Sequence, residues 1–230
     1  FWIDIFVKTL NMIGFIVQAR TGSTRLPNKI LQPFHGERNI LEIMIDQLLA
    51  HFPDLPLILA TSTAKADDAL EAFREKYPSI KLYRGSENDV LERSLEAAQH
   101  FGLDEFIRVC SDNPFLQTQF VQDLIDQPSG ADYISYEVDG LPTIRTHYGL
   151  FAERVNASAL ARAYDRKPSD FYREHVTNFI YGHPEDFSLQ WLDIGKQLEG
   201  LEKLRLTIDD PQDFEGAQKI YSDLYKNQNE

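Results

Sequence analysis

The chain has 230 residues, of which 43% are hydrophobic and 26% are charged, and its formal net charge at pH 7 is −13. This composition is typical of a folded globular chain. A charge this negative argues against nucleic-acid or anionic-membrane partners, which would repel the chain, and no apolar run reaches the roughly 18 residues of a membrane span. A single cysteine, Cys110, excludes an internal disulfide and is compatible with the reducing cytoplasm, where we expect the protein to act.

An apolar and aromatic stretch, residues 1–11, precedes Met12. It lacks the basic start and the small-residue cleavage site of a signal peptide. Two interpretations stay open: Met12 is the natural start and the stretch is an artefact of the gene boundary, or the stretch is an arm that packs on a second subunit. The second interpretation would make the protein a homodimer. We expect one domain over residues 12–225, followed by a frayed tail at 226–230.

Apolar runs of strand length alternate with segments of helical period in the first half of the chain. The predicted strands are 13–17, 57–61, 81–83 and 106–110, and the predicted helices between them are 40–49, 67–77 and 90–101. A further helix over 119–127 is expected to begin after Thr118 as its cap. This alternation predicts an α/β fold, with a mostly parallel sheet and helices on both of its faces.

The pattern changes in the second half, where Pro, Ser, Gly and Asp become frequent. We interpret residues 130–185 as an inserted lobe of the same domain. Its expected elements are strands at 133–136 and near 149–151, and helices at 157–164 and 171–181. Strands are then predicted at 188–191 and 205–208. A closing helix over 212–224 follows Pro211, a residue favoured in the first helical turn.

Three cations, a glycine and three hydroxyls follow the first predicted strand. They are Arg20, Thr21, Gly22, Ser23, Thr24, Arg25 and Lys29. In open α/β sheets ligands bind outside the carboxyl ends of the strands, and the backbone N–H groups of such a turn can hold phosphate together with Arg or Lys. The P-loop and Gly-x-Gly-x-x-Gly patterns are absent, which disfavours a dinucleotide-binding enzyme. We interpret the loop as a clamp on a triphosphate or its leaving pyrophosphate; a solvated loop with scattered charges is the alternative.

Carboxylates follow two other predicted strands. Asp112 comes just after the fourth strand, and Asp209 ends the strand at 205–208. Carboxylates at strand ends are suited to hold Mg²⁺ beside a nucleotide. Asp112 could instead begin a turn before Pro114. Asp210 is placed to cap the closing helix, with Asp213 three residues later, although it could also join a metal site.

The loop sequence resembles the amino-terminal signature of sugar cytidylyltransferases. The matching run is Gln18-Ala19-Arg20-x-Gly22-Ser23-x-Arg25-Leu26-Pro27-x-Lys29-x-Leu31. This family includes the enzymes that make CMP-3-deoxy-manno-octulosonate and CMP-sialic-acid-like sugars, and the spore-coat polysaccharide type. Further segments similar to family motifs are 89–93, 108–114, 173–177 (Arg-Glu-His-Val-Thr) and 206–213. The resemblance therefore extends from residue 12 to about residue 225.

The resemblance implies a nucleotide-diphospho-sugar transferase-like fold, CTP as substrate and Mg²⁺ as cofactor. It implies Asp112 and Asp209 as metal ligands, with Arg20 and Lys29 on the phosphates as the other catalytic residues. The expected nucleotide-binding residues are Gln18, Ala19, Arg20, Gly22, Ser23, Arg25, Lys29 and Arg108. The expected reaction moves CMP from CTP to a hydroxyl of a sugar, of the 3-deoxy-2-keto acid class, for surface polysaccharide synthesis.

Arg145, His147 and His175 in the expected lobe are candidates for binding the acceptor sugar, since a carboxylate on that sugar would suit Arg145. Phe151 departs from the spore-coat type, which usually has an acidic residue there. Two alternatives stay open: a transferase of the same fold that uses another nucleotide or moves a sugar, and a non-catalytic nucleotide-binding protein, which only Phe151 supports. Cys110 is interpreted as a small core residue rather than a nucleophile.

Overall fold

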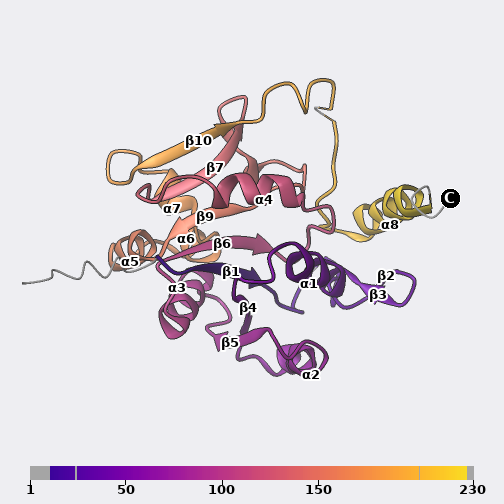
Figure 1. Ribbon diagram of the computed structural model, residues 1–230. Helices are drawn as coiled ribbons and strands as arrows, with labels where there is room; N and C mark the ends of the chain where they lie inside the picture. The colour runs from indigo at the N-terminus through magenta and orange to yellow at the C-terminus, as the bar shows by residue number, and fades with distance from the viewer. Residues whose placement is uncertain (1–10, 24, 202, 227–230) are drawn as a thin grey trace, which may run out of the picture.

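The computed structural model describes residues 11–23, 25–201 and 203–226, and a β-sheet forms its centre (Figure 1). Within these residues the sheet has eight strands, in the order β10-β7-β9-β6-β1-β4-β5, with β8 paired to β7. The strands are β1 (Ile13–Gln18), β4 (Leu57–Ser62), β5 (Lys81–Gly85), β6 (Glu105–Cys110), β7 (Tyr133–Val138), β8 (Leu141–Pro142), β9 (Glu153–Asn156) and β10 (Leu189–Asp193). The expectations for residues 1–10, for Thr24 and for the tail 227–230 lie outside the described residues.

The pairing of the strands confirms the expected α/β sheet. β1 lies between β4 and β6 and is parallel to both, and β5 continues the parallel order beyond β4. β9 is antiparallel to β6 and to β7, whereas β10 is parallel to β7. Because β1, β4 and β6 all run the same way, the loops after their carboxyl ends meet at one edge of the sheet.

Helices cover both faces of this sheet (Figure 1). They include α1 (Ile40–His51) and α4 (Thr118–Ile125) on one face, and α3 (Val90–Phe101) and α5 (Ala157–Asp165) on the other. The alternation of side chains along β1 explains this layering, since Phe15 and Val17 join the core under α1 while Ile16 joins the core under α3. Asn39 and Glu42 form a capping box that begins α1, and Gly102 ends α3 in the left-handed conformation.

The carboxyl-terminal helix α8 (Pro211–Lys226) packs beside a small hairpin that the sequence did not reveal. Phe34 of the hairpin contacts Phe214 and Tyr221 of α8 edge to face, which builds a separate small core. The remaining elements are β2 (Pro33–His35), β3 (Arg38–Asn39), α2 (Ala72–Lys76), α6 (Asp170–Glu174), α7 (Asn178–Tyr181) and two 3₁₀ segments, Lys65–Glu71 and Thr143–Arg145. Among the described helices, none combines the length and hydropathy that crossing a membrane requires.

Two predicted strands are wrong, and the same contact explains both. Residues 149–151 and 205–208 are not strands; instead, the two segments run past each other. Leu206 and Thr207 donate their N–H groups to the carbonyl of His147, at 2.8 and 3.2 Å. Gly149 has a φ of +64°, and a Cβ there would lie 3.0 Å from the carbonyl carbon of Leu206, so the close approach requires glycine.

Three helix predictions also need correction. The segment 67–77 is a 3₁₀ segment followed by the short α2, and 171–181 divides into α6 and α7. The division falls at Val176, whose φ of +40° is incompatible with a continuous helix. α4 starts at Thr118 itself, after Gln117, without a side-chain cap. The segment 130–185, expected to form an inserted lobe, supplies β7 and β9 to the main sheet together with α5, α6 and α7.

Candidate functional site

The loop after β1 is anchored by Asp67, a residue that the sequence analysis missed. The Asp67 carboxylate accepts hydrogen bonds from the backbone N–H and the hydroxyl of Thr21, both at 2.7 Å, and from the Ser62 hydroxyl. Its side chain is buried. Burial alone would raise the pKa of Asp67, but the hydrogen bonds from Ser62 and Thr21 outweigh burial and hold the pKa below its ordinary value. The one feature of the sequence that could have indicated Asp67 is its position, a carboxylate five residues after the end of the apolar strand β4.

Substituting Asp67→Ala is expected to lower the free energy of unfolding by about 1–3 kcal/mol at pH 7, because three buried donors lose their acceptor. The folded-state pKa lies below the unfolded one, so this contribution is complete at neutral pH and is lost as pH falls through about 4 and below. Urea unfolding at several pH values measures it. Asp68→Ala is the control, since Asp68 is exposed and paired with Arg84; equal losses for both variants would contradict the anchoring role.

The three cations of the loop each contact a carboxylate from a distant part of the chain. The distances are 3.3 Å from Arg20 Nη2 to Glu174 Oε1, 3.4 Å from Arg25 Nη2 to Asp209 Oδ1, and 2.8 Å from Lys29 Nζ to Asp112 Oδ2. Lys29 Nζ also donates to the carbonyl of Ile208 at 2.5 Å. Lys29 therefore joins the end of β6 to the segment before α8, and Arg25 and Lys29 together bring both predicted metal ligands to the loop.

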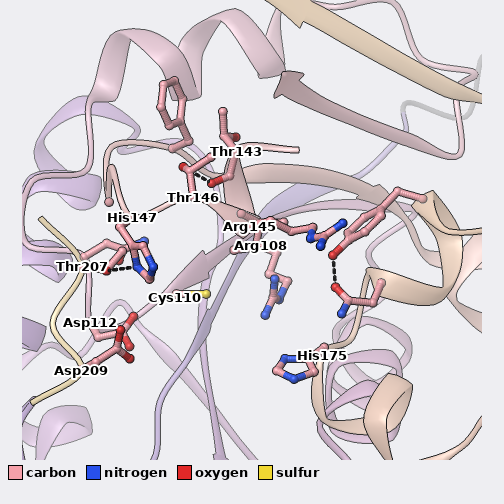
Figure 2. A pocket seen from close by; sticks show the side chains of 16 residues that line it. Arg108, Cys110, Asp112, Thr143, Arg145, Thr146, His147, His175, Thr207 and Asp209 are labelled. Atoms are coloured by element: carbon pink, nitrogen blue, oxygen red, sulfur yellow. Dashed lines mark hydrogen bonds between the residues drawn. The ribbon is translucent and has the colours of Figure 1, made fainter. Parts of the chain in front are cut away.

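The carboxylates of Asp112 and Asp209 lie next to each other at one side of the cavity in Figure 2. Asp209 is held at 2.9 Å by Arg205, whose hydrogen bonds also lower the pKa of Asp213 to about 2. Asp210 accepts the N–H of Asp213 at 2.9 Å, as expected of a helix cap. The structure thus brings Asp112 and Asp209 together and gives Asp210 and Asp213 structural partners.

The donor set at Asp112 and Asp209 fits Mg²⁺ only in company with a nucleotide. In residues 11–23, 25–201 and 203–226 no group of three or more His, Cys, Asp or Glu side chains is arranged to hold a metal ion. Mg²⁺ usually takes one or two carboxylates and completes its octahedron with phosphate oxygens and water. Two neighbouring carboxylates beside a cationic loop match that requirement.

Two cavities meet at this edge of the sheet. The first, which we call the loop cavity, has a volume of about 360 Å³. It is lined by every predicted nucleotide-binding residue except Ala19, namely Gln18, Arg20, Gly22, Ser23, Arg25, Lys29 and Arg108. Ala19 is buried and donates its N–H to the carbonyl of Ala60, so its side chain lies in the core.

The second cavity, which we call the lobe cavity, has a volume of about 480 Å³ and is lined by Arg145, His147 and His175 (Figure 2). His147 Nδ1 lies 3.2 Å from the Thr207 hydroxyl, and the His175 ring lies 4.9 Å from Phe171. The guanidinium of Arg145 forms no ion pair within the described residues. The lobe cavity therefore presents a cation that is not neutralised by a neighbouring side chain.

Phe151 belongs mainly to the core, although it also borders the lobe cavity. It is 6% exposed, and its ring stacks on Phe120 with centroids 4.7 Å apart. The ring thus joins an aromatic cluster in the core and also forms part of the wall of the lobe cavity. Cys110 borders both cavities, and burial raises the pKa of its thiol to about 11, so it is not a thiolate nucleophile at neutral pH.

Comparison with known proteins decides the family. The family model described as cytidylyltransferase matches residues 14–230. The chain belongs to the cytidylyltransferase family. It is 34% identical over 221 residues to the spore coat polysaccharide biosynthesis protein SpsF of Bacillus subtilis, covering 92% of this chain and 87% of that one. It is 23% identical over 224 residues to the 3-deoxy-manno-octulosonate cytidylyltransferase of Aeromonas salmonicida, covering 83% and 85%.

A solved cytidylyltransferase structure from Leptospira borgpetersenii superposes on this chain with a TM-score of 0.78. The two chains share 25% sequence identity, and the match covers 90% of this chain and 84% of the other. Membership of the cytidylyltransferase family is thus supported by sequence and by fold. It confirms the resemblance found in the loop motif and the expected nucleotidyltransferase-like fold.

Proposed function

We propose that this cytidylyltransferase moves CMP from CTP to a hydroxyl of a sugar acid, of the 3-deoxy-2-keto class, and releases pyrophosphate. The observation that carries the proposal is that the loop cavity and the lobe cavity share a border on which Asp112 and Asp209 lie. A nucleotide bound by the cationic loop and a sugar in the lobe cavity would meet at this border. The name of SpsF supports a product used in polysaccharide synthesis, and the name of the octulosonate enzyme supports a sugar acid as acceptor.

The loop supplies the charge that a triphosphate needs. Arg20, Arg25 and Lys29 line one side of the loop cavity, and the phosphates would exchange with the carboxylates that these cations now contact. The half-exposed pairs of Arg20 and Arg25 are worth little, so the exchange costs little. Asp112 and Asp209, once released, would hold Mg²⁺ together with the phosphates. When bound, Mg²⁺ neutralises phosphate oxygens and lowers the pKa of the attacking hydroxyl.

The reaction is an in-line displacement at phosphorus. The oxygen of the sugar hydroxyl forms a bond to the α-phosphorus, the bond to the β-phosphate oxygen breaks, and its electron pair leaves with pyrophosphate. The hydroxyl proton passes to solvent. Such transfers need little covalent chemistry from the protein, so positioning and charge dominate catalysis. Lys29 and Arg20 would stabilise the charge that builds on the departing pyrophosphate.

The acceptor is proposed to be an acid because of Arg145. This residue lines the lobe cavity and forms no ion pair with any residue that the structure describes, in a chain whose net charge is −13. A carboxylate on the sugar would pair with its guanidinium in a forked geometry. His147 and His175 border the same cavity and would contact sugar hydroxyls.

Pyrophosphate release from CTP with a panel of 3-deoxy-2-keto sugar acids tests the proposal. Wild type is expected to turn over with at least one acid and Mg²⁺, and Asp112→Asn to slow that turnover about 100-fold or more. In thermal shift, CTP is expected to stabilise the chain more than UTP, GTP or ATP. Asp54→Asn, on an exposed loop, is the control. No turnover across the panel, or an active Asp112→Asn, would refute the assignment.

A further inference from the structure

The two cavities have five residues in common, and these mark the place where the substrates would meet. They are Arg108, Cys110, Asp112, His175 and Asp209. If CTP lies in the loop cavity and the acceptor in the lobe cavity, the α-phosphate must lie at this border, since it is bonded to one substrate before transfer and to the other after it. Of these five side chains, a guanidinium offers the most N–H donors to a phosphate oxygen. Arg108 is thus the arginine at the border.

The guanidinium of Arg108 is fixed before any ligand arrives. It is 6% exposed, and three of its bonds are internal. Nε and Nη2 donate to Gln18 Oε1 at 3.3 and 3.1 Å, and Nη1 donates to Glu153. A guanidinium has five N–H groups, so these bonds leave two for an oxygen of a ligand. In Figure 2 Arg108 projects into the cavity between Cys110 and His175.

Glu153 holds Arg108, and two hydroxyls hold Glu153. Its carboxylate is buried at 1% exposure on β9. Oε2 pairs with Arg108, while Oε1 accepts from the Tyr133 hydroxyl at 2.5 Å and from the Thr177 hydroxyl at 2.8 Å. Without those hydroxyls the carboxylate could rotate, and the guanidinium would lose its fixed orientation. A buried ion pair of this kind needs such extra hydrogen bonds to be well placed.

The residue before Thr177 is held in a demanding backbone conformation. That residue is Val176, which is fully buried, β-branched and has a φ of +40°. Such a conformation persists only where the surroundings enforce it, and it concentrates at functional sites. Three residues before Thr177, Glu174 contacts Arg20 of the loop after β1. The segment from Glu174 to Thr177 therefore contacts both the loop after β1 and the ion pair of Glu153 with Arg108.

We propose that Arg108 contacts the transferred α-phosphate, and that Thr177 and Tyr133 are positioning residues that act on Arg108 through Glu153. The inference rests on the proposed use of CTP. A cation whose orientation is fixed in advance stabilises charge on the reacting phosphate without reorganising, which is the basis of electrostatic catalysis. Since the contact is to the α-phosphate, it exists in CMP as well as in CTP and is absent from cytidine.

The affinities of cytidine, CMP and CTP, measured by competition with a fluorescent CTP analogue, test this inference without a known acceptor. Thr177→Val is expected to weaken CMP and CTP binding by a similar factor, about 3- to 10-fold, as for one lost hydrogen bond, and to leave cytidine binding unchanged. Thr177→Ser keeps the hydroxyl and is expected to restore the affinity. Tyr133→Phe removes the other hydroxyl and is expected to act like Thr177→Val.

Thr61→Val is the matched control. Thr61 is as buried as Thr177, but its hydroxyl has no hydrogen-bond partner in the described part of the chain, so its loss should leave all three affinities unchanged. The inference would be overturned if the folded Thr177→Val and Tyr133→Phe variants bound CMP with wild-type affinity. It would also be overturned if these variants lost as much affinity for cytidine as for CMP, since the site as a whole would then be disturbed. A wild type that binds neither CTP nor CMP would instead refute the proposed nucleotide.

Discussion

Replacing Lys29 with methionine is expected to slow pyrophosphate release from CTP by about 100- to 1000-fold, the usual loss for one preorganised group that stabilises transition-state charge. Lys29 Nζ lies 2.8 Å from Asp112 and 2.5 Å from the carbonyl of Ile208. Methionine keeps the length of the side chain but removes the cation that contacts Asp112 and the carbonyl before Asp209. The variant is therefore expected both to bind CTP more weakly and to lose turnover with bound CTP.

Lys76→Met is the control for Lys29→Met. Lys76 also pairs with a carboxylate, Glu42, at 2.6 Å, but on α2, away from both cavities. Its loss should leave kcat and the KM for CTP unchanged. Steady-state kinetics with saturating sugar acid and varied CTP separates the two constants. If Lys29→Met raised only the KM for CTP, its contribution to the reacting state would be refuted and a binding role would remain.

The parallel half of the fold could be predicted because burial alone decides it. β1, β4 and β6 are covered by helices on both faces, so their sequences are nearly continuous apolar runs. β9 was missed because its sequence is Glu-Arg-Val-Asn, and its buried charges are neutralised across strands. Glu153 pairs with Arg108, and Arg154 pairs with Glu105. A pattern of hydrophobicity cannot distinguish such a strand from an exposed turn.

The segments 149–151 and 205–208 show a second limit. Each is apolar enough for a strand, yet their actual contact uses one carbonyl, of His147, and a glycine with positive φ. Whether a segment becomes a strand depends on a partner far away in the chain, about which local sequence carries no information. The turn at Val176 is similar, because tertiary contacts impose a φ that valine alone would avoid.

The residues of the candidate site also fall into two groups, those that the sequence predicts and those that only the structure reveals. Ligand-facing residues could be proposed from sequence, since Arg20, Lys29, Asp112 and Asp209 are charged residues that follow or flank apolar runs. The structure brings all four to one edge of the sheet. The sequence did not reveal Asp67, which anchors the loop, or Glu153 and Thr177, which fix Arg108. Each acts through a hydrogen bond to a residue far away in sequence. Their roles depend on three-dimensional contacts alone.

Replacing Arg154 with leucine is expected to lower the free energy of unfolding by about 3–5 kcal/mol, the cost of leaving one partner of a buried ion pair alone. Arg154 Nε donates to Glu105 Oε2 at 3.1 Å, and both side chains are buried. Its Nη1 also donates to three carbonyls at the end of α4, those of Leu124, Ile125 and Gln127, at 3.0, 3.3 and 2.7 Å. Leucine fills part of the space but satisfies none of these acceptors.

Urea unfolding measures this loss, and Arg162→Leu is the control. Arg162 is half-exposed and pairs with Asp132, so its replacement should lower the free energy of unfolding by at most about 1 kcal/mol. The double variant Glu105→Met with Arg154→Leu is expected to recover part of the stability, because no buried charge then lacks a partner. Recovery would show that the penalty comes from the stranded carboxylate of Glu105. If the double variant lost as much free energy of unfolding as the two single variants together, the carbonyls at the end of α4 would account for the effect of Arg154→Leu instead. If Arg154→Leu were as stable as Arg162→Leu, the ion pair would not support the join between β6 and β9.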